Sequence, residues 1–506
     1  MPHRSRFLLA GLAASALLGA CKGLPPSEQA QAPVAEAAPL SEWGARLAGD
    51  AQALHDGLDR NHPGAADPLN PGFARTNSEA LARALSHAPQ ATDAAGWWWA
   101  LREYAAAFDD AHLDVYLESD TVSFQQTWAG FLTRYQAGDF VVAARDETLA
   151  GLPPMGARLV ACDGASAEAF AASRVGRFRG RWTMESQKIT HAPWLFRDSG
   201  NPWAARPQTC TFDGPDGAAD YAINWYPLTL EEVGQRLDQV RPPLRMEVSL
   251  KLVERGGYWI SLPDFTGNPD STLYPHLSAL MDELAAKQAA LRAAPFVVLD
   301  VRDNGGGSSR WSQIVGETLW GADWIAAHPV PESTSVDWRA SEENLAELEP
   351  YVAQFREMGD PVMINWIERV VSGLAAARAE GDAFWIDAGE GAGEPVPLSA
   401  DAVSQMTGKV FVLTDAACFS ACLDAVDLWK AAGAVQAGQV TGGDTVYIEN
   451  RSVTLPSGLA GYAQSMKVYR GRHRGNNEPH VPAHVFGGDI GDDAAVISWV
   501  SALAAE

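Results

Sequence analysis

The serine at position 420 occupies a place in the chain where a side chain can act as a nucleophile. A strand-like apolar run at 410–413 leads through a short loop to Ser420, and a helical segment follows over 420–432. A serine at a helix start lies near free N–H groups and the positive end of the helix dipole, which stabilise negative charge. The alternative is an N-cap serine, although Leu423, three residues on, does not complete a capping box. The residues alone leave nucleophile and cap equally open.

A glycine-rich segment follows a second apolar strand. Residues 296–301 form the strand, and Asn304, Gly305, Gly306 and Gly307 come directly after it. Glycines expose backbone N–H groups and allow a close approach, so the segment is suited to bind an oxyanion or a phosphate. It lacks the Gly-Lys-Ser/Thr of a P-loop and the spacing of a dinucleotide fingerprint. Considered alone, the segment is equally an ordinary strand-to-loop turn.

Four segments in order along the chain resemble the motifs of the S41 serine peptidases, the family of the tail-specific and tricorn proteases. The first is Asp300-x-Arg302-x-Asn304 with its three glycines, and the second is 417–424 around Ser420. The third, 438–445, is similar to the family's Gly-x-x-Thr-x-Gly loop. The fourth, 477–482, resembles its Pro-x-x-Pro-Asp tail, with Ala483 in place of the Asp. The resemblance as a whole covers roughly residues 41–500 and implies a serine peptidase with Ser420 as nucleophile.

The family uses two kinds of partner for its serine, and the sequence favours one of them. Tail-specific members use a lysine about 25 residues after the serine. This chain has Thr445 at that position (420 + 25) and no lysine between Lys430 and Lys467. Tricorn-like members instead use a histidine from the N-terminal half and a glutamate from the tail. The resemblance therefore implies a Ser–His–Glu arrangement.

The segment 108–113 resembles the family's histidine segment, which implies His112 as general base, with Ala111 where tricorn-like members have a bridging serine. Glu478, 58 residues after Ser420 (478 − 420), is the implied acid that orients the base. The resemblance also implies an oxyanion hole that consists of the backbone N–H of Ala421 and the backbone N–H of either Gly305 or Gly306. Three other histidines near the tail compete for the role of base: His473, His480 and His484.

These segments require a mixed α/β fold. From about 229 to 500, strand-like runs at 258–262, 296–301, 410–413 and 435–440 alternate with helical segments such as 273–291, which is typical of a mostly parallel sheet with right-handed crossovers. The resemblance assigns this region to the S41 catalytic core, of the ClpP/crotonase type. A largely helical insertion is expected over about 311–400.

The region before the core divides into two predicted parts. A helical N-terminal region with strands covers 41–145: Leu47, Ala51, Leu54 and Leu58 keep helical spacing, and strand-like runs follow at 122–132 and 140–144. Over 146–228 we expect a PDZ-like module, because the segment 155–164, an apolar run that ends in an Asp-Gly turn, resembles part of one.

The N-terminus is typical of a secreted lipoprotein. Arg4 and Arg6 precede an apolar run over 7–18, too short to span a membrane, and Leu-Gly-Ala precedes Cys21. This resembles the bacterial lipobox, so 1–20 is a predicted signal peptide and Cys21 the lipidated residue, rather than a chance cysteine. Lys22 favours sorting to the outer membrane, and 21–40 is a predicted disordered tether. We expect a lipid-anchored envelope protein that faces the periplasm.

Composition and cysteine content narrow the remaining choices. A formal net charge of −25 over 506 residues argues against nucleic-acid partners. Cys162 and Cys210 lie beside strand-like runs of one module in an oxidising compartment, so of the three pairings open to four cysteines we predict a disulfide here. For Cys418 and Cys422 we predict no disulfide, and no metal site, because no further Cys or His lies at ligand spacing. No cofactor is expected.

The expected activity is hydrolysis of peptide bonds through an acyl-enzyme on Ser420, with a peptide or protein as substrate. Two alternatives stay open. One is a catalytically inactive envelope protein whose PDZ-like module binds peptides by strand addition. The other is a non-peptide ester hydrolase on the same scaffold.

The lipobox yields a prediction of its own. The mature protein should begin at Cys21 and carry acyl chains, and Cys21→Ser should leave the precursor uncleaved or release a soluble form. Mass spectrometry of the mature N-terminus checks this. An unmodified N-terminus, or cleavage at another site, would contradict it.

Overall fold

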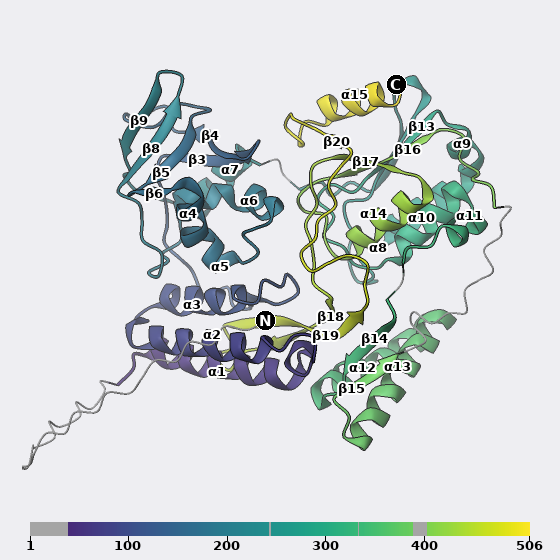
Figure 1. Ribbon diagram of the computed structural model, residues 1–506, viewed down its shortest axis with the longest axis horizontal. Coiled ribbons are helices and arrows are strands. Elements are labelled where there is room, and N and C mark those ends of the chain that lie inside the picture. Colours follow the sequence, from purple (N-terminus) through teal and green to yellow (C-terminus); the bar gives the residue numbers. More distant parts are fainter. Residues whose placement is uncertain (1–38, 242–243, 332, 388–401) are drawn as a thin grey trace, which may run out of the picture. The chain divides into compact units, whose positions relative to one another are not determined.

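The predicted core is built around a six-stranded, mostly parallel sheet (Figure 1). In the order β11-β12-β13-β16-β17-β20, β11 is antiparallel to its neighbour and the other pairs are parallel. The computed structural model describes residues 39–241, 244–331, 333–387 and 402–506. The strands of this sheet are β11 Ser249–Leu252, β12 Tyr258–Ser261, β13 Phe296–Asp300, β16 Lys409–Thr414, β17 Val435–Gly438 and β20 His484–Val485.

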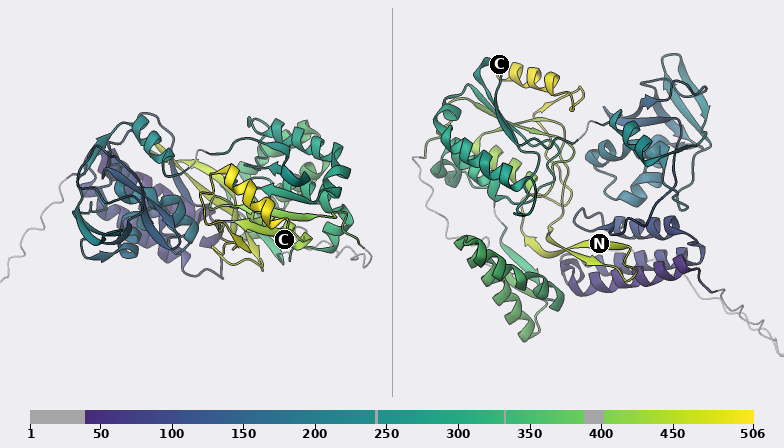
Figure 2. Two further views of the ribbon diagram at one scale, coloured as in Figure 1. Left: turned by 90° about the horizontal axis from the view of Figure 1, so that it is seen from above. Right: turned by 180° about the vertical axis from the view of Figure 1, so that it is seen from behind.

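Helices cover both faces of this sheet, and alternate residues of the central strands pack against them. Val297 and Val412 lie in a core shared with α8 Tyr274–Ala286, α9 Gln288–Ala293, α10 Arg310–Trp320, α11 Ala322–Ala327 and α14 Ala421–Ala432. Val298 and Phe411 lie in a second core with α15 Asp493–Leu503, on the opposite side of the sheet (Figure 2). Burial on both faces explains why these strands are continuous apolar runs.

A second sheet joins strands that are far apart in the sequence. Its central strand β19 Ala460–Arg470 pairs with β1 Asp114–Leu117, β14 Ser335–Arg339 and β18 Tyr447–Thr454, and β15 Phe384–Asp387 pairs with β14. The segment predicted as a helical insertion therefore contributes two strands as well as α12 Glu342–Met358 and α13 Pro361–Glu380. Strand β14 is defined by pairing with β19 and by packing of Trp338 under these two helices, and β15 is defined by pairing with β14. Local periodicity reveals none of these contacts.

Three N-terminal helices pack against this second sheet: α1 Glu42–Asn61, α2 Phe73–His87 and α3 Ala94–Ala106. Leu47, Ala51, Leu54 and Leu58, the helical repeat of α1, are fully buried against Val115 of β1 and Tyr462 of β19, among others. This contact fixes the start of β1, which directly follows the predicted base His112.

The antiparallel module begins earlier than predicted. Its sheet has the order β3-β4-β5-β8-β9 with β6 beside β5, and it starts at Phe131 rather than 146 because β3 and β4 form a hairpin. The expected strand at 122–132 is two strands, since β2 belongs to a separate sheet of order β10-β2-β7. The elements are β2 Gln126–Trp128, β3 Phe131–Gln136, β4 Asp139–Arg145, β5 Arg158–Cys162, β6 Ala165–Ser166, α4 Ala167–Ala171, α5 Arg177–Arg179, α6 Glu185–His191, β7 Arg197–Asp198, β8 Thr209–Gly214, β9 Gly217–Ala222, β10 Tyr226–Leu228 and α7 Leu230–Asp238.

The predicted fold class is confirmed: a mixed α/β protein with N-terminal helices, an antiparallel β module and a mostly parallel sheet. Cys21 and the signal peptide lie outside the described residues, as does nearly all of the tether. Within the described ranges, no helix combines the length and apolar character needed to cross a membrane.

Cys162 and Cys210, the pair predicted from the sequence, form a disulfide in the structure. The two residues lie opposite each other in the β5–β8 register, with their Cα atoms 4.0 Å apart. Both side chains are buried in the core of the antiparallel module. The bond therefore ties together two strands that are separated by 48 positions in the chain.

Replacing both of these cysteines with alanine should lower the free energy of unfolding of this module by about 3–4 kcal/mol, because a 48-residue loop is no longer closed in the unfolded chain. Denaturant unfolding followed by tryptophan fluorescence measures the change. A matched control is the double alanine variant of Cys418 and Cys422, where only 4 positions separate the two residues and the entropic effect should be about 2 kcal/mol. Two free thiols at 162 and 210 in the denatured, non-reduced protein would contradict the pairing.

Candidate active site

Ser420 lies at the turn between β16 and α14, in a backbone conformation that L-residues rarely adopt. Its φ is 55° and its ψ is −126°, and its side chain makes no capping hydrogen bond to the helix. A non-glycine residue in this region is strained, and such strain is concentrated at functional sites. The geometry therefore does not match the N-cap alternative and leaves the hydroxyl available for other contacts.

His112 is brought to this serine from the N-terminal half of the chain. Its Nε2 lies 3.4 Å from the Ser420 Oγ, and the two residues are 308 positions apart. The imidazole is buried and packs against the ring of Phe419, with ring centroids 4.7 Å apart. The distance is near the outer limit of a hydrogen bond, which is common for a nucleophile and base without substrate.

The electrostatic surroundings of His112 are mixed. Burial lowers the pKa of the imidazole to about 4, because removal from water disfavours its charged form. The carboxylate of Asp444 raises the pKa, while the guanidinium groups of Arg181 and Arg472 lower it. At neutral pH the imidazole is therefore unprotonated, as a general base must be.

Asp110 holds the backbone of the histidine segment. Its Oδ1 accepts the N–H of His112 at 2.9 Å, and burial raises the pKa of its carboxyl to about 6. Its second oxygen lies 3.9 Å from the Nε2 of His62, whose Nδ1 accepts the N–H of Gly64 at 3.0 Å. Burial, with the nearby His112, lowers the pKa of His62 to about 3, so this second histidine is neutral. Neither Asp110 nor His62 was predicted from the sequence to take part in this site.

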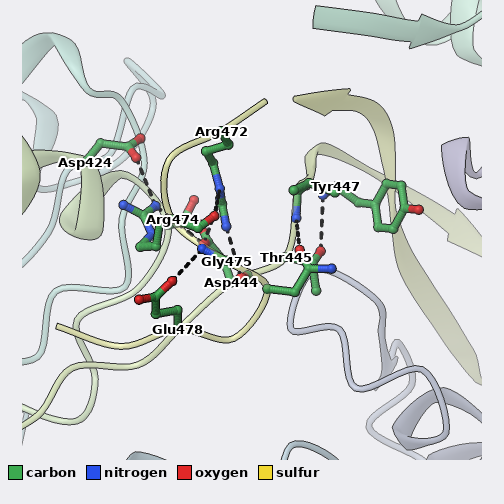
Figure 3. A network of polar contacts seen from close by, with 12 residues as sticks. Asp424, Asp444, Thr445, Tyr447, Arg472, Arg474, Gly475 and Glu478 are labelled. Carbon is green, nitrogen blue, oxygen red and sulfur yellow. Dashed lines mark hydrogen bonds and ion pairs between the residues drawn. The ribbon is translucent and has the colours of Figure 1, made fainter. Parts of the chain in front are cut away.

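A buried network surrounds Asp444, the acid that most favours protonation of His112 (Figure 3). Asp444 pairs with Arg472 at 2.9 Å and with Arg474 at 3.4 Å, and Arg474 also bonds Asp424 and Asp427 on the first turns of α14. Asp444 is 1% exposed, and its Oδ2 has no hydrogen-bond partner within the described chain. The network thus fixes the charge of Asp444 near His112 and attaches it to the helix that begins at Ser420.

Glu478 is not brought to His112. Its side chain is exposed, and its carboxylate accepts the N–H of Gly475 at 2.7 Å (Figure 3). Of the two acids, Asp444 is the one whose charge raises the pKa of His112, and it was not predicted from the sequence. The available signal was its place inside the 438–445 segment that resembles a family loop.

The glycine-rich segment lies directly against Ser420. A Cβ on Gly306 would come within 2.8 Å of the Ser420 Cβ, so only glycine fits there. The Gly306 N–H is donated to the Asn304 side chain at 2.8 Å, which leaves it unavailable to an oxyanion. Gly305 is exposed, with open space around its Cβ position, and Ala421 is the first residue of α14. Gly305 and Ala421 are therefore better placed as oxyanion donors than Gly306.

Cys418 and Cys422 form a disulfide, so the prediction of no bond between them is wrong. The turn at Ser420 leads into α14 and brings the two Cα atoms to 5.4 Å, and both side chains are fully buried. Sequence spacing alone does not reveal this turn. The bond encloses Ser420 between its two cysteines.

The other candidate bases have different partners. His473 and His480 each lie 3.1 Å from the carboxylate of Asp427, and His484 is in β20. Lys467 forms an ion pair with Glu449 in the second sheet, and Lys430 is exposed on α14. The structure therefore places His112, rather than these groups, beside Ser420.

No protein-family model matches this chain, and no curated protein matches it. Among solved structures the chain is similar to mature CPAF, with a TM-score of 0.54 and 13% identity over 92% of this chain and 98% of that one. The structure of mature CPAF complexed with lactacystin gives a TM-score of 0.54 and 13% identity over 92% and 99%. A photosystem II D1 C-terminal processing protease aligns over 89% and 99% with 14% identity and a TM-score of 0.31. The likeness to CPAF extends over nearly the whole of both chains and shows that they share a fold.

Proposed function

We propose that this protein is a serine-type peptidase that cleaves peptide bonds through an acyl-enzyme on Ser420, with His112 as general base. The observation that supports this most directly is the 3.4 Å approach of His112 Nε2 to the Ser420 Oγ. The strained backbone at Ser420 and the adjacent glycine segment add to it. The S41-like motifs of the sequence and the fold shared with CPAF agree with this reaction class.

The reaction follows from the positions of these groups. His112 Nε2 takes the proton of the Ser420 hydroxyl as its oxygen attacks the peptide carbonyl, and the N–H groups of Ala421 and Gly305 receive the developing oxyanion. The imidazolium then gives its proton to the leaving amine. Water, activated by the same imidazole, hydrolyses the acyl-enzyme and restores the Ser420 hydroxyl.

Asp444 takes the supporting role that the sequence assigned to Glu478. Burial weakens His112 as a base, so the protonated imidazole formed during the reaction needs a nearby negative charge. Asp444 supplies that charge through space, and the backbone of Tyr447 also favours the protonated imidazole. Asp444 is accordingly an electrostatic residue.

We further propose that the protein is anchored by a lipid at Cys21 in the bacterial envelope and faces the periplasm. This rests on the lipobox-like N-terminus. Two disulfides, Cys162–Cys210 and Cys418–Cys422, suit an oxidising compartment of that kind.

Ser420→Ala should abolish covalent labelling by a fluorophosphonate probe while the fold persists, because only an activated serine reacts. His112→Ala should reduce labelling by a comparable factor, since nucleophile and base act as a unit. In-gel fluorescence measures both. Lys430→Met, on the exposed face of α14, is the matched control and should label like the parent.

Labelling that persists in Ser420→Ala would contradict the proposal that Ser420 is the nucleophile of an enzyme. A parent protein that does not label would favour the inactive peptide-binding alternative. Labelling without cleavage of peptides, but with cleavage of esters, would favour the ester hydrolase.

The rate of labelling should fall on the acid side only near pH 4, because His112 must be neutral to act as base and burial lowers its pKa to about 4. Asp444 raises this pKa, so Asp444→Asn should move the acid limb to lower pH. The same variant should reduce the plateau rate by about 100-fold, as the imidazolium loses its supporting charge. Glu478→Gln is the comparison and should change both quantities far less.

A pH–rate profile of each variant checks this. An acid limb that does not move in Asp444→Asn, together with a large loss in Glu478→Gln, would assign the supporting role to Glu478 instead.

A further inference from the structure

An arginine without a counter-ion lies next to the histidine segment. Within the described ranges, the guanidinium of Arg179, the last residue of α5, has neither a hydrogen bond nor an ion pair. Its Cζ lies 4.4 Å from the ring centroid of Trp194 and 5.7 Å from that of Trp99. These rings favour a cation but provide no opposite charge. Asp114 lies close enough to favour the charged form of Arg179, yet its Oδ1 is already bonded to Arg102 at 2.5 Å.

This guanidinium lines a recess of about 120 Å³ whose wall is rich in unpaired polar groups. Arg102 and Gln187 are each 7% exposed, and the Arg102 Nε and the Gln187 Oε1 have no hydrogen-bond partner within the described chain. The Nδ1 of His191, in the same wall, also has none among those residues. Buried polar atoms normally have partners, so their grouping around one cavity indicates a polar ligand.

Three arginines, Arg102, Arg179 and Arg181, line the recess together with three aspartates. The pKa of His191 lies well below its usual range, first because the imidazole is buried and then because four arginines repel its proton: Arg179, Arg102, Arg181 and Arg241. Such a concentration of guanidinium groups attracts anions.

The recess adjoins the segment that carries His112. Ala111 and Leu113, the residues on either side of His112, form part of its wall. Arg181, another wall residue, has its Cζ 5.8 Å from the ring centroid of Phe419, the residue before Ser420. A group bound here would therefore lie against the segment that carries His112 and close to Arg181, which contacts Phe419.

We propose that this recess binds a carboxylate of the peptide substrate, with Arg179 as the residue that pairs with it. The planar guanidinium fork matches a carboxylate, and pairing would supply the missing counter-ion. Asp109, Asp110 and Asp114 also line the recess, so the site suits a single negative charge better than a phosphate dianion. The role as substrate subsite rests on the proposed peptidase function. The carboxylate can come from the C-terminus of a peptide or from an acidic side chain.

Binding is measured by calorimetry on the full mature chain carrying Ser420→Ala, so that no probe is consumed. The probes are acetyl-trialanine amide, acetyl-trialanine with a free C-terminus, the amide with a central glutamate, and sodium sulfate. At least one carboxylate peptide should bind about tenfold more tightly than the neutral amide, a difference of about 1.4 kcal/mol. The peptide that does so identifies the source of the carboxylate.

Arg179→Gln in the same background should remove this preference, and Arg179→Lys should keep part of it. Arg75→Gln, an exposed arginine on α2, is the matched control and should leave the preference unchanged. Circular dichroism and thermal melting verify that Arg179→Gln folds. Its melting temperature should be equal to or above that of the parent, because a half-buried charge without an ion-pair partner among the described residues is removed.

Equal affinity for the carboxylate and amide peptides would overturn the inference, as would a preference that survives in folded Arg179→Gln. Sulfate that binds as tightly as the best peptide would also overturn it, since the site would then be an unselective anion site. Failure of the peptidase proposal has a different signature. A parent protein that cleaves no peptide while Arg179-dependent carboxylate binding persists would contradict the proposed function and support the binding site.

Discussion

The pairing of β1 with β19 is the contact on which the candidate site depends. It aligns Asp114 with Ala463 and Leu117 with Ala460, and so joins the N-terminal helical region to the C-terminal part of the chain. His112 lies two residues before β1, and Ser420 lies directly before α14, so neither element alone can bring the imidazole to the hydroxyl. The helical repeat of α1 packs against the same pair of strands and holds this register through apolar burial.

Burial of charged groups is the second constraint on the site. Removal from water lowers the pKa of His112 and His62 and raises that of Asp110, so each of these groups is driven toward its neutral form. The carboxylate of Asp444, which forms ion pairs with Arg472 and Arg474, acts on His112 in the opposite direction and raises the pKa of the imidazole. His112 is therefore neutral before the reaction, and the negative charge of Asp444 stabilises the imidazolium that forms during it. The same low-polarity surroundings make the unpaired guanidinium of Arg179 costly unless a ligand neutralises it.

The predictions from the sequence that were wrong share one physical cause: the structure of each segment depends on contacts with residues far away in the chain. Glu478 has the spacing expected of an orienting acid, but the segment it occupies turns its carboxylate to the Gly475 amide. Cys418 and Cys422 bond because the strained turn at Ser420 brings them together, and no local pattern encodes that turn. The strands β14 and β15 lie in a segment with helical character; β14 is defined by pairing with β19, and β15 by pairing with β14.

The sequence by itself determined the alternating strands and helices of the core and the apolar stripe of α1, because these depend on residue type and on periods of two and 3.6, which are local properties of the chain. The segments that carry Ser420, His112 and the glycines were implied by the resemblance of their motifs to those of the S41 peptidases. Tertiary structure alone decided which acid supports His112, which glycine N–H stays free, and how Arg102, Arg179 and Arg181 meet in one recess. Each of those depends on the distances between side chains of separate elements and on the desolvation of buried groups. Neither can be predicted from the local sequence.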